Sequence, residues 1–239
     1  DASAGTLSPH ALQLTRPMDV WTIPGFTTGM LSVQDEAAQM AALLLAPRAG
    51  ERILVACAAP GGKACHILEV QPALAELVAM DIDAGRLQRV AENMARLNLV
   101  ATLVVGNAAH PPPQMLPSSF DRILVDAPCT ASGVIRRHPD VKLLRRGSDI
   151  AQLADQQLQI LKGLWPLLKP GGTLLYATCS IFSEENSQVV QRFLCTQGDA
   201  SALQEPVAWG EEVACGRQLL PAHDGPDGLF YALLCKAST

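Results

Sequence analysis

Two cysteines follow predicted strands and could act together. Asp126 and Cys129 belong to an Asp-Ala-Pro-Cys segment that closes the apolar stretch 120–126, and Cys179 follows the stretch 173–178. Parallel strands that lie side by side would bring a carboxylate and two thiols to one sheet edge. A lone cysteine there is usually a packing residue. Two beside a nucleotide-type loop favour chemistry, because a thiolate adds reversibly to an activated ring carbon.

That loop is the segment 57–63, between a predicted strand and a predicted helix. Its small residues leave backbone N–H groups open to a ligand at the helix N-terminus. A Walker A loop is excluded because it needs Gly at position 57 and Ser or Thr at position 64, and no GxGxxG motif is present. The candidate cofactor-binding residues are Cys57, Ala58, Ala59, Pro60, Gly61, Gly62 and Lys63.

An acid follows at the expected distance. Asp81 ends the second predicted strand, 19 residues beyond Gly62. A doubly wound fold places an acid there on the ribose hydroxyls of its cofactor. A site for S-adenosylmethionine and one for a dinucleotide both remain open at this point.

The elements that position these residues alternate between strands and helices. Such alternation predicts an α/β fold with a mostly parallel sheet, helices on both faces, and ligands at the carboxyl ends of the strands. Strands are predicted over 52–57, 76–81, 101–105, 120–126, 173–178 and 229–235, and helices over 34–46, 62–70, 84–98, 150–168 and 184–195. Residues 1–33 read as short strands and turns, which we expect to be the tail of an N-terminal module before a larger domain over 34–239.

Composition agrees with a folded domain. Of 239 residues, 49% are apolar and 17% are charged, which excludes a mainly disordered chain. The apolar runs are too short for a membrane span, and no signal sequence is apparent. The seven cysteines include no CxxC pair, so we expect neither a disulfide framework nor a metal site. A cytoplasmic protein is predicted.

Several motifs together resemble the RNA 5-methylcytosine methyltransferases. They are Cys-Ala-Ala-Pro-Gly-Gly-Lys at 57–63, Asp-Ala-Pro-Cys at 126–129, Thr-Cys-Ser at 178–180 and the stretch 132–146. The likeness runs from Thr15 to Lys236, includes 31–35 and 227–232, and is strongest to the B type that acts on bacterial small-subunit (16S) ribosomal RNA. Four motifs in the right order are specific, whereas one alone would not be.

The resemblance implies a class I S-adenosylmethionine-dependent methyltransferase, with a Rossmann-like, seven-stranded sheet. It implies that the 57–63 loop, Asp81, Asn107 and Asp126 bind S-adenosylmethionine. Cys179 matches the family's nucleophile for C6 of cytosine, and Cys129 matches the cysteine linked to product release. Asp126 and Lys63 are expected at the target base. The family's N-terminal RNA-binding domain would precede Asp1, so the resemblance implies that 1–33 is the remnant of an RNA-binding or linker module and that 34–239 is the methyltransferase catalytic domain. We expect a monomer.

Basic residues gather directly after Cys129. The window 136–146 holds five basic residues and one acid, a net charge of +4, whereas the whole chain carries −5. A local basic lip on an acidic body could meet RNA phosphates, although a solvated loop has the same composition. The candidate RNA-binding residues are Arg136, Arg137, Lys142, Arg145 and Arg146.

Three positions depart from the family pattern. Val55 stands where the family often has Asp, Ala64 replaces Thr, and Asn107 replaces the Asp that usually meets the adenine. An Asn oxygen can still accept a hydrogen bond from the adenine amino group. The departures leave open a non-catalytic RNA-binding relative with weak cofactor binding. A nucleotide-dependent oxidoreductase is a second alternative, against which the paired thiols and the missing GxGxxG count.

Overall fold

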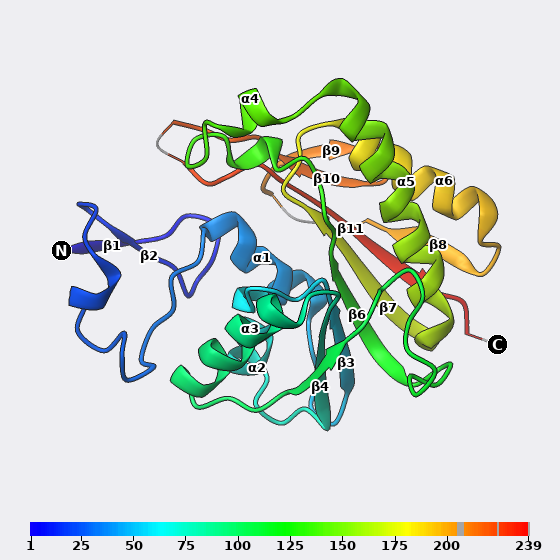
Figure 1. Ribbon diagram of the computed structural model, residues 1–239, viewed down its shortest axis with the longest axis horizontal. Helices are drawn as coiled ribbons and strands as arrows, with labels where there is room; N and C mark the ends of the chain where they lie inside the picture. Colours follow the sequence, from blue (N-terminus) through cyan, green and yellow to red (C-terminus); the bar gives the residue numbers. More distant parts are fainter. Residues whose placement is uncertain (205–207, 224, 239) are drawn as a thin grey trace.

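The fold is built on one large sheet. A computed structural model describes residues 1–204, 208–223 and 225–238. Within these residues, nine strands pair in the order β5-β4-β3-β6-β7-β11-β10-β9, with β8 also paired to β11 (Figure 1). The strands of this sheet are β3 Arg52–Ala56, β4 Glu76–Asp81, β5 Thr102–Val105, β6 Phe120–Asp126, β7 Leu168–Thr178, β8 Ala200–Leu203, β9 Glu211–Val213, β10 Gly216–Leu219 and β11 Leu229–Lys236.

The five strands from β5 to β7 are parallel, whereas β8 to β11 pair antiparallel with their neighbours. The predicted mostly parallel sheet is therefore confirmed, but the expected count of seven strands is wrong. The unpredicted strands β8, β9 and β10 are only three or four residues long. Segments this short contain too few residues to show a clear apolar alternation along the chain.

Helices cover both faces of the sheet. The helices are α1 Glu36–Leu45, α2 Gly62–Val70, α3 Ala84–Arg96, α4 Val141–Leu144, α5 Gly147–Leu164 and α6 Ser187–Thr196. Side chains alternate across each strand, so Ile53 and Val55 pack with α1, α2 and α3, while Leu54 and Ala56 pack with α5 and α6. Both layers are visible around the central strands (Figure 1).

Two predicted elements end differently from expectation. The helix predicted over 150–168 stops at Leu164, and residues Trp165–Leu167 form a 3₁₀ turn because Pro166 cannot donate a backbone hydrogen bond. Pro170, Gly171 and Gly172, predicted as a turn, lie inside β7 at a register shift against β6. The bulge lets the chain bend there while the pairing continues to Thr178.

The N-terminal segment forms a small unit beside α1. A two-stranded hairpin of β1 Ala2–Ala4 and β2 Leu12–Leu14 precedes a 3₁₀ turn at Val20–Thr22. The backbone N–H groups of Leu7 and Ser8 donate to the Glu36 carboxylate in the first turn of α1. These short strands and turns match the prediction for 1–33, and the division of the chain at residue 33 stays a prediction.

Candidate active site

The carboxyl ends of the parallel strands meet at one edge of the sheet. β3, β4 and β6 pair in parallel and end at Ala56, Asp81 and Asp126, and β7 ends beside β6 at Thr178. The predicted neighbourhood of β6 and β7 is therefore present. This edge receives the 57–63 loop on one side and both cysteine segments on the other.

The backbone turns sharply in the 57–63 loop. Cys57 has a φ of 56°, the Ala59–Pro60 peptide bond is cis, and Gly61 has a φ of 104° at the N-cap of α2. The Ala58 N–H donates to the Met80 carbonyl at 3.0 Å. A backbone position with a φ near 100° favours glycine, which explains the residue type at position 61.

Gly61 and Gly62 have different surroundings. A Cβ on Gly61 would come within 3.2 Å of Val90, whereas a Cβ on Gly62 would meet only Gln34 Nε2 at 3.8 Å. The space beside Gly62 is therefore open at the N-terminus of α2, where backbone N–H groups attract a polar or anionic group. The loop fits the polar end of a cofactor such as S-adenosylmethionine.

Asp81 lies directly beneath this loop. It is 2% exposed, and its two oxygens accept hydrogen bonds from the N–H groups of Ala59 and Asp83 at 3.1 and 3.2 Å. The Arg86 guanidinium lies 3.6 Å away. Asp81 therefore fixes the loop, and its predicted contact with ribose hydroxyls would use the remaining lone pairs of these oxygens.

Asn107 follows β5 in an exposed loop. Its Oδ1 atom accepts a hydrogen bond from the Ala109 N–H at 2.9 Å, which closes a short turn. The other two departures from the family pattern, Val55 and Ala64, are fully buried in the core with α1 and α2. Val55 thus packs the core, and cofactor contact by Asn107 stays a prediction.

An ion pair joins the two sides of the site. Lys63 Nζ lies 2.7 Å from Asp126 Oδ1, and the two side chains are 13% and 26% exposed. Lys63 comes from the start of α2 and Asp126 from the end of β6. Because the pair is mostly buried, it holds a positive and a negative group in fixed positions beside the cysteines.

The two thiols lie in direct contact. Cys129 Sγ is 3.4 Å from Cys179 Sγ, and both residues are partly buried. The Gly133 N–H donates to the Cys179 carbonyl at 2.9 Å, which ties the two loops together. The prediction that the strand ends bring both thiols to one place agrees with this geometry.

The environment gives the thiols different acidities. A hydrogen bond donated by Cys129 lowers the pKa of Cys179, and the positive charge of Lys63 lowers it further, although burial and Asp126 oppose them. That hydrogen bond, followed by burial, raises the pKa of Cys129 well above its ordinary value. Cys179 is therefore the more acidic of the two thiols, and the Cys129 S–H stabilises its thiolate form.

Cys57 is the third thiol at this edge. Burial, and then the negative charges of Asp126 and Asp81, raise the pKa of Cys57 to about 12. It stays a neutral thiol at physiological pH, and its contact with the cofactor stays a prediction.

Arg136 and Arg137 face buried carboxylates in the described structure. Arg137 donates two hydrogen bonds to Asp227, one of them from Nε at 2.8 Å, and Asp227 is fully buried. Arg136 lies 3.6 Å from Asp227 and 3.7 Å from Asp35. The Asp227 N–H also donates to Asp35. These contacts join the motifs at 31–35 and 227–232 to the start of the basic lip.

The other basic residues lie further along the lip. Lys142, Arg145 and Arg146 are exposed, and Arg145 Nε donates to the Thr130 carbonyl at 3.0 Å. The lip therefore sits above the Cys129 loop, where α4 lies at the top of the molecule (Figure 1). RNA contact by all five basic residues stays a prediction.

Two buried carboxylates near the site, Glu185 and Asp227, were not predicted as site residues, and both are fully buried. Asp35 caps α1, because its side chain accepts a hydrogen bond from the Ala37 N–H at 2.9 Å. Asp227 and Asp35 lie inside motifs that carry the resemblance, which was a usable signal. Glu185 had no such signal, because its partners Thr130 and Gln157 lie 55 and 28 positions away in the sequence.

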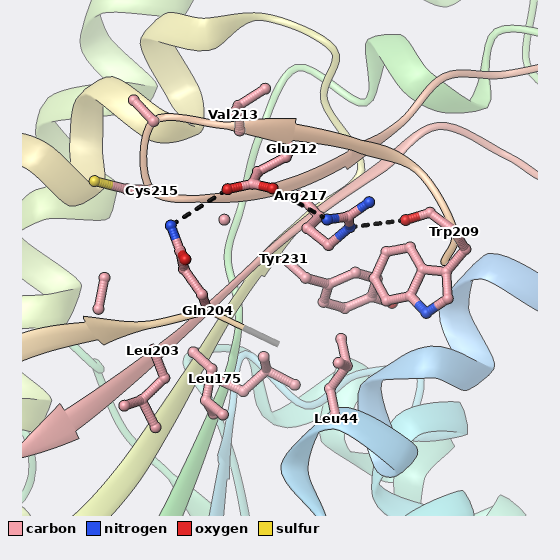
Figure 2. A pocket seen from close by; sticks show the side chains of 14 residues that line it. Leu44, Leu175, Leu203, Gln204, Trp209, Glu212, Val213, Cys215, Arg217 and Tyr231 are labelled. Atoms are coloured by element: carbon pink, nitrogen blue, oxygen red, sulfur yellow. Dashed lines mark hydrogen bonds and ion pairs between the residues drawn. The ribbon is translucent and has the colours of Figure 1, made fainter. Parts of the chain in front are cut away.

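A separate cavity of about 760 Å³ lies beside the antiparallel strands β8 to β11 (Figure 2). Its wall includes Leu175 and Tyr231 from the central strands and Trp209 and Arg217 from the β9–β10 region. Arg217 Nε donates to the Trp209 carbonyl at 2.8 Å across the cavity edge. The residues described as lining this cavity include none of the predicted site residues.

The described part of the chain contains no helix long and apolar enough to cross a membrane. Within the same residues, no group of three or more His, Cys, Asp or Glu side chains could hold a metal ion.

The sheet, the 57–63 loop and the strand-end acids define a Rossmann-like methyltransferase of the S-adenosylmethionine-dependent class I. The sequence comparison is more specific: residues 42–235 match the family described as 16S rRNA methyltransferase RsmB/F. The chain belongs to this family.

Two curated relatives carry the name Ribosomal RNA small subunit methyltransferase B. The protein from Shewanella oneidensis is 52% identical over 238 residues, which is 100% of this chain and 55% of that protein. The protein from Pseudomonas syringae pv. tomato is 50% identical over 242 residues, 99% of this chain and 54% of that protein. The chain thus spans about half the length of these relatives.

Solved structures agree with the fold. A methyltransferase homologue from Pyrococcus horikoshii has a TM-score of 0.83 at 30% identity and covers 99% of this chain and 78% of its own. NSun6 from Pyrococcus horikoshii, solved with SFG, has a TM-score of 0.79 at 26% identity. The match covers 96% of this chain and 60% of the NSun6 chain. The class I fold expected from the sequence is confirmed.

Proposed function

We propose that this chain is the catalytic part of an S-adenosylmethionine-dependent RNA cytosine-5 methyltransferase that acts on small-subunit ribosomal RNA. The observation that carries the proposal is the 3.4 Å contact between Cys129 Sγ and Cys179 Sγ beside the Lys63–Asp126 pair. The names of the relatives and the family match support the choice of RNA as substrate.

The chemistry requires covalent help from the protein, because C5 of cytosine is too weak a nucleophile to accept a methyl group unaided. The Cys179 thiolate adds to C6, a C–S bond forms, and the electron pair of the C5–C6 double bond becomes available at C5. S-adenosylmethionine, when bound by the 57–63 loop and Asp81, supplies the methyl group. Covalent catalysis divides one difficult step into easier ones.

Release reverses the addition. A base removes the proton from C5, the C5–C6 double bond re-forms, and Cys179 leaves C6 as a thiolate. Cys129 is 3.4 Å from Cys179 and can donate its S–H to the leaving sulfur. This contact supports the assignment of Cys129 to product release.

The ion pair supports the addition step. Lys63 and Asp126 lie beside Cys179, and the charge of Lys63 lowers the pKa of Cys179. A hydrogen bond donated to N3 of the base from this pair would help the ring accept electrons. The target base must leave its stack to reach these groups.

Substrate binding would use more than this site. The basic lip over 136–146 offers exposed cations at Lys142, Arg145 and Arg146 for phosphate contacts. We expect an N-terminal RNA-binding module, of which 1–33 is the remnant, to supply further affinity. We further propose that the protein is a monomer and acts in the cytoplasm.

Labelled S-adenosylmethionine tests this function. The purified chain and a Cys179→Ser variant are incubated with small-subunit ribosomal RNA that lacks 5-methylcytosine, and the RNA is digested to nucleosides. We expect labelled 5-methylcytidine with the unmodified chain and none with Cys179→Ser. Label in another nucleoside, or equal label with the variant, would contradict the proposal.

The same assay, together with binding titrations, separates the alternatives. A non-catalytic relative would neither methylate RNA nor bind the cofactor in a titration. An oxidoreductase would bind a nicotinamide nucleotide. The paired thiols and the family match favour the methyltransferase over both.

A further inference from the structure

A buried carboxylate lies behind the two reactive thiols. Glu185 is fully buried in a 3₁₀ turn at Ser183–Glu185, after the Cys179 segment. The Tyr176 hydroxyl donates to the Glu185 carbonyl at 2.7 Å and fixes the backbone of this turn. A buried charge is costly unless hydrogen bonds satisfy it, so the partners of this side chain are informative.

The Glu185 carboxylate bonds the residue that follows each cysteine. Oε1 accepts from the Thr130 N–H at 2.8 Å, and Oε2 accepts from the Thr130 hydroxyl at 2.6 Å. Oε2 also accepts from the Ser180 hydroxyl at 2.5 Å. Thr130 follows Cys129 and Ser180 follows Cys179, so one carboxylate holds both cysteine segments.

Further hydrogen bonds surround this connection. Gln157 Nε2, from α5, donates to Glu185 Oε1 at 3.3 Å and to the Pro128 carbonyl at 2.8 Å. The Ser132 hydroxyl lies 3.1 Å from the Ser180 hydroxyl. All donors to the carboxylate are neutral, so its negative charge is bound but not cancelled.

We propose that Glu185 is a positioning residue that holds the Cys129 and Cys179 loops in register and keeps the two thiols in contact. The inference deepens the proposed function and rests on it, because the proposed function gives the two thiols their roles in methyl transfer. Glu185 acts through its neighbours and does not touch the reacting atoms.

The electrostatics agree with this geometry. The negative charge of Glu185 adds to the hydrogen bond and the burial that raise the pKa of Cys129. A thiol kept protonated can donate to Cys179, and that hydrogen bond is the main cause of the lowered pKa of Cys179. Loss of the Glu185 charge should therefore bring the two acidities closer together.

Glu185→Gln tests the inference, because it keeps the size of the side chain and removes its charge. Glu184→Gln is the matched control: it makes the same chemical change one residue away on an exposed side chain. Iodoacetamide reacts with thiolates, and peptide mass spectrometry separates the cysteines. The pH midpoint of each alkylation curve reports ionisation independently of how accessible the thiol is.

In the unmodified chain and in Glu184→Gln, we expect the Cys179 midpoint to lie well below that of Cys129. In Glu185→Gln the two midpoints should move together, mainly through a fall in the midpoint of Cys129, because the negative charge of Glu185 contributes to the raised pKa of that thiol. Methyl transfer should slow by at least about tenfold, with the cofactor Kd within about twofold of the unmodified chain, because only the thiol geometry changes.

An unchanged midpoint separation in folded Glu185→Gln would overturn the inference. If that variant does not fold, Ser180→Ala removes one of the two connections without changing any charge, and a narrowed separation supports the inference while an unchanged one overturns it. The alkylation assay needs neither RNA nor cofactor. If the proposed function fails, the chain without substitutions would instead show separate alkylation midpoints for the two cysteines but would methylate no RNA.

Discussion

The two sides of the catalytic edge are built in different ways. The cofactor side is shaped by the backbone, with positive φ angles at Cys57 and Gly61. The thiol side is held by side chains, among them the fully buried Glu185 and Asp227. Changes on the first side should therefore alter binding, whereas changes on the second should alter reactivity and stability.

The strongest test of this difference is at Lys63, which joins the two sides. Lys63→Met removes the positive charge 2.7 Å from Asp126, so the pKa of Cys179 should rise and less thiolate should be present at neutral pH. We expect kcat to fall on the order of 100-fold at pH 7, and the rate to recover partly at higher pH.

The pH profile of single-turnover methyl transfer measures this effect. In the unmodified chain the rate should rise with pH through a midpoint below the ordinary thiol value, because only the thiolate attacks. A Lys63→Met profile with the same midpoint would show that Lys63 does not act on Cys179.

Asp227→Asn tests the stability of the thiol side. The substitution leaves Arg137 facing a buried neutral amide and weakens the link to Asp35. Since Arg137 is 48% exposed, we expect a loss of about 2 kcal/mol of unfolding free energy, below the range for fully buried pairs.

Asp155→Asn is its control, because Asp155 is 68% exposed in its pair with Arg192. That change should cost less than about 0.5 kcal/mol. Denaturant unfolding measures both variants. Equal losses would remove the distinction between the buried and the exposed ion pair.

Two adjacent glycines test the cofactor side. Gly61→Ala forces a side chain into a φ of 104° within 3.2 Å of Val90, so it should destabilise the fold by about 1 kcal/mol or more. Gly62→Ala has room, and alanine favours a helix, so stability should be kept or slightly increased.

Both alanine variants should bind S-adenosylmethionine more weakly, because each disturbs the loop that faces it. Thermal unfolding and a cofactor titration measure the two effects separately. Unchanged affinity in Gly62→Ala would contradict the placement of the cofactor at the N-terminus of α2.

The smallest expected effect is at Asn107. Asn107→Asp supplies a carboxylate acceptor for the adenine amino group, which binds a donor more strongly than an amide oxygen does. We expect the cofactor Kd to fall by about threefold, with no change in the alkylation midpoint of Cys179. Calorimetric titration measures the affinity, and an unchanged Kd would place Asn107 away from the adenine.

The same division explains what the sequence could predict. The 57–63 loop and the strand ends were predictable because Gly, Pro and apolar runs act locally along the chain. Arg137 and Asp227 are 90 positions apart, and Thr130 and Glu185 are 55 apart. Local spacing contains no information about such contacts, so two arginines assigned only to RNA also proved to be ion-pair partners.

Strand number failed for a related reason. β9 and β10 are short strands without the run of apolar residues that marks β3 or β6. Their pairing depends on the edge that β11 provides, which exists only in the folded sheet. A prediction from local patterns finds buried strands and misses those that the tertiary structure recruits.

The covalent role of Cys179 is the central claim, and a Cys129→Ala variant tests it most directly. Without the thiol that assists release, the RNA should stay bound to the protein through Cys179. The variant is incubated with S-adenosylmethionine and unmethylated small-subunit ribosomal RNA, separated under denaturing conditions, and digested for mass spectrometry. We predict a nucleotide adduct on the peptide that contains Cys179, absent from a Cys129→Ala, Cys179→Ser double variant. Methylated RNA without any adduct, or an adduct on another residue, would contradict the account.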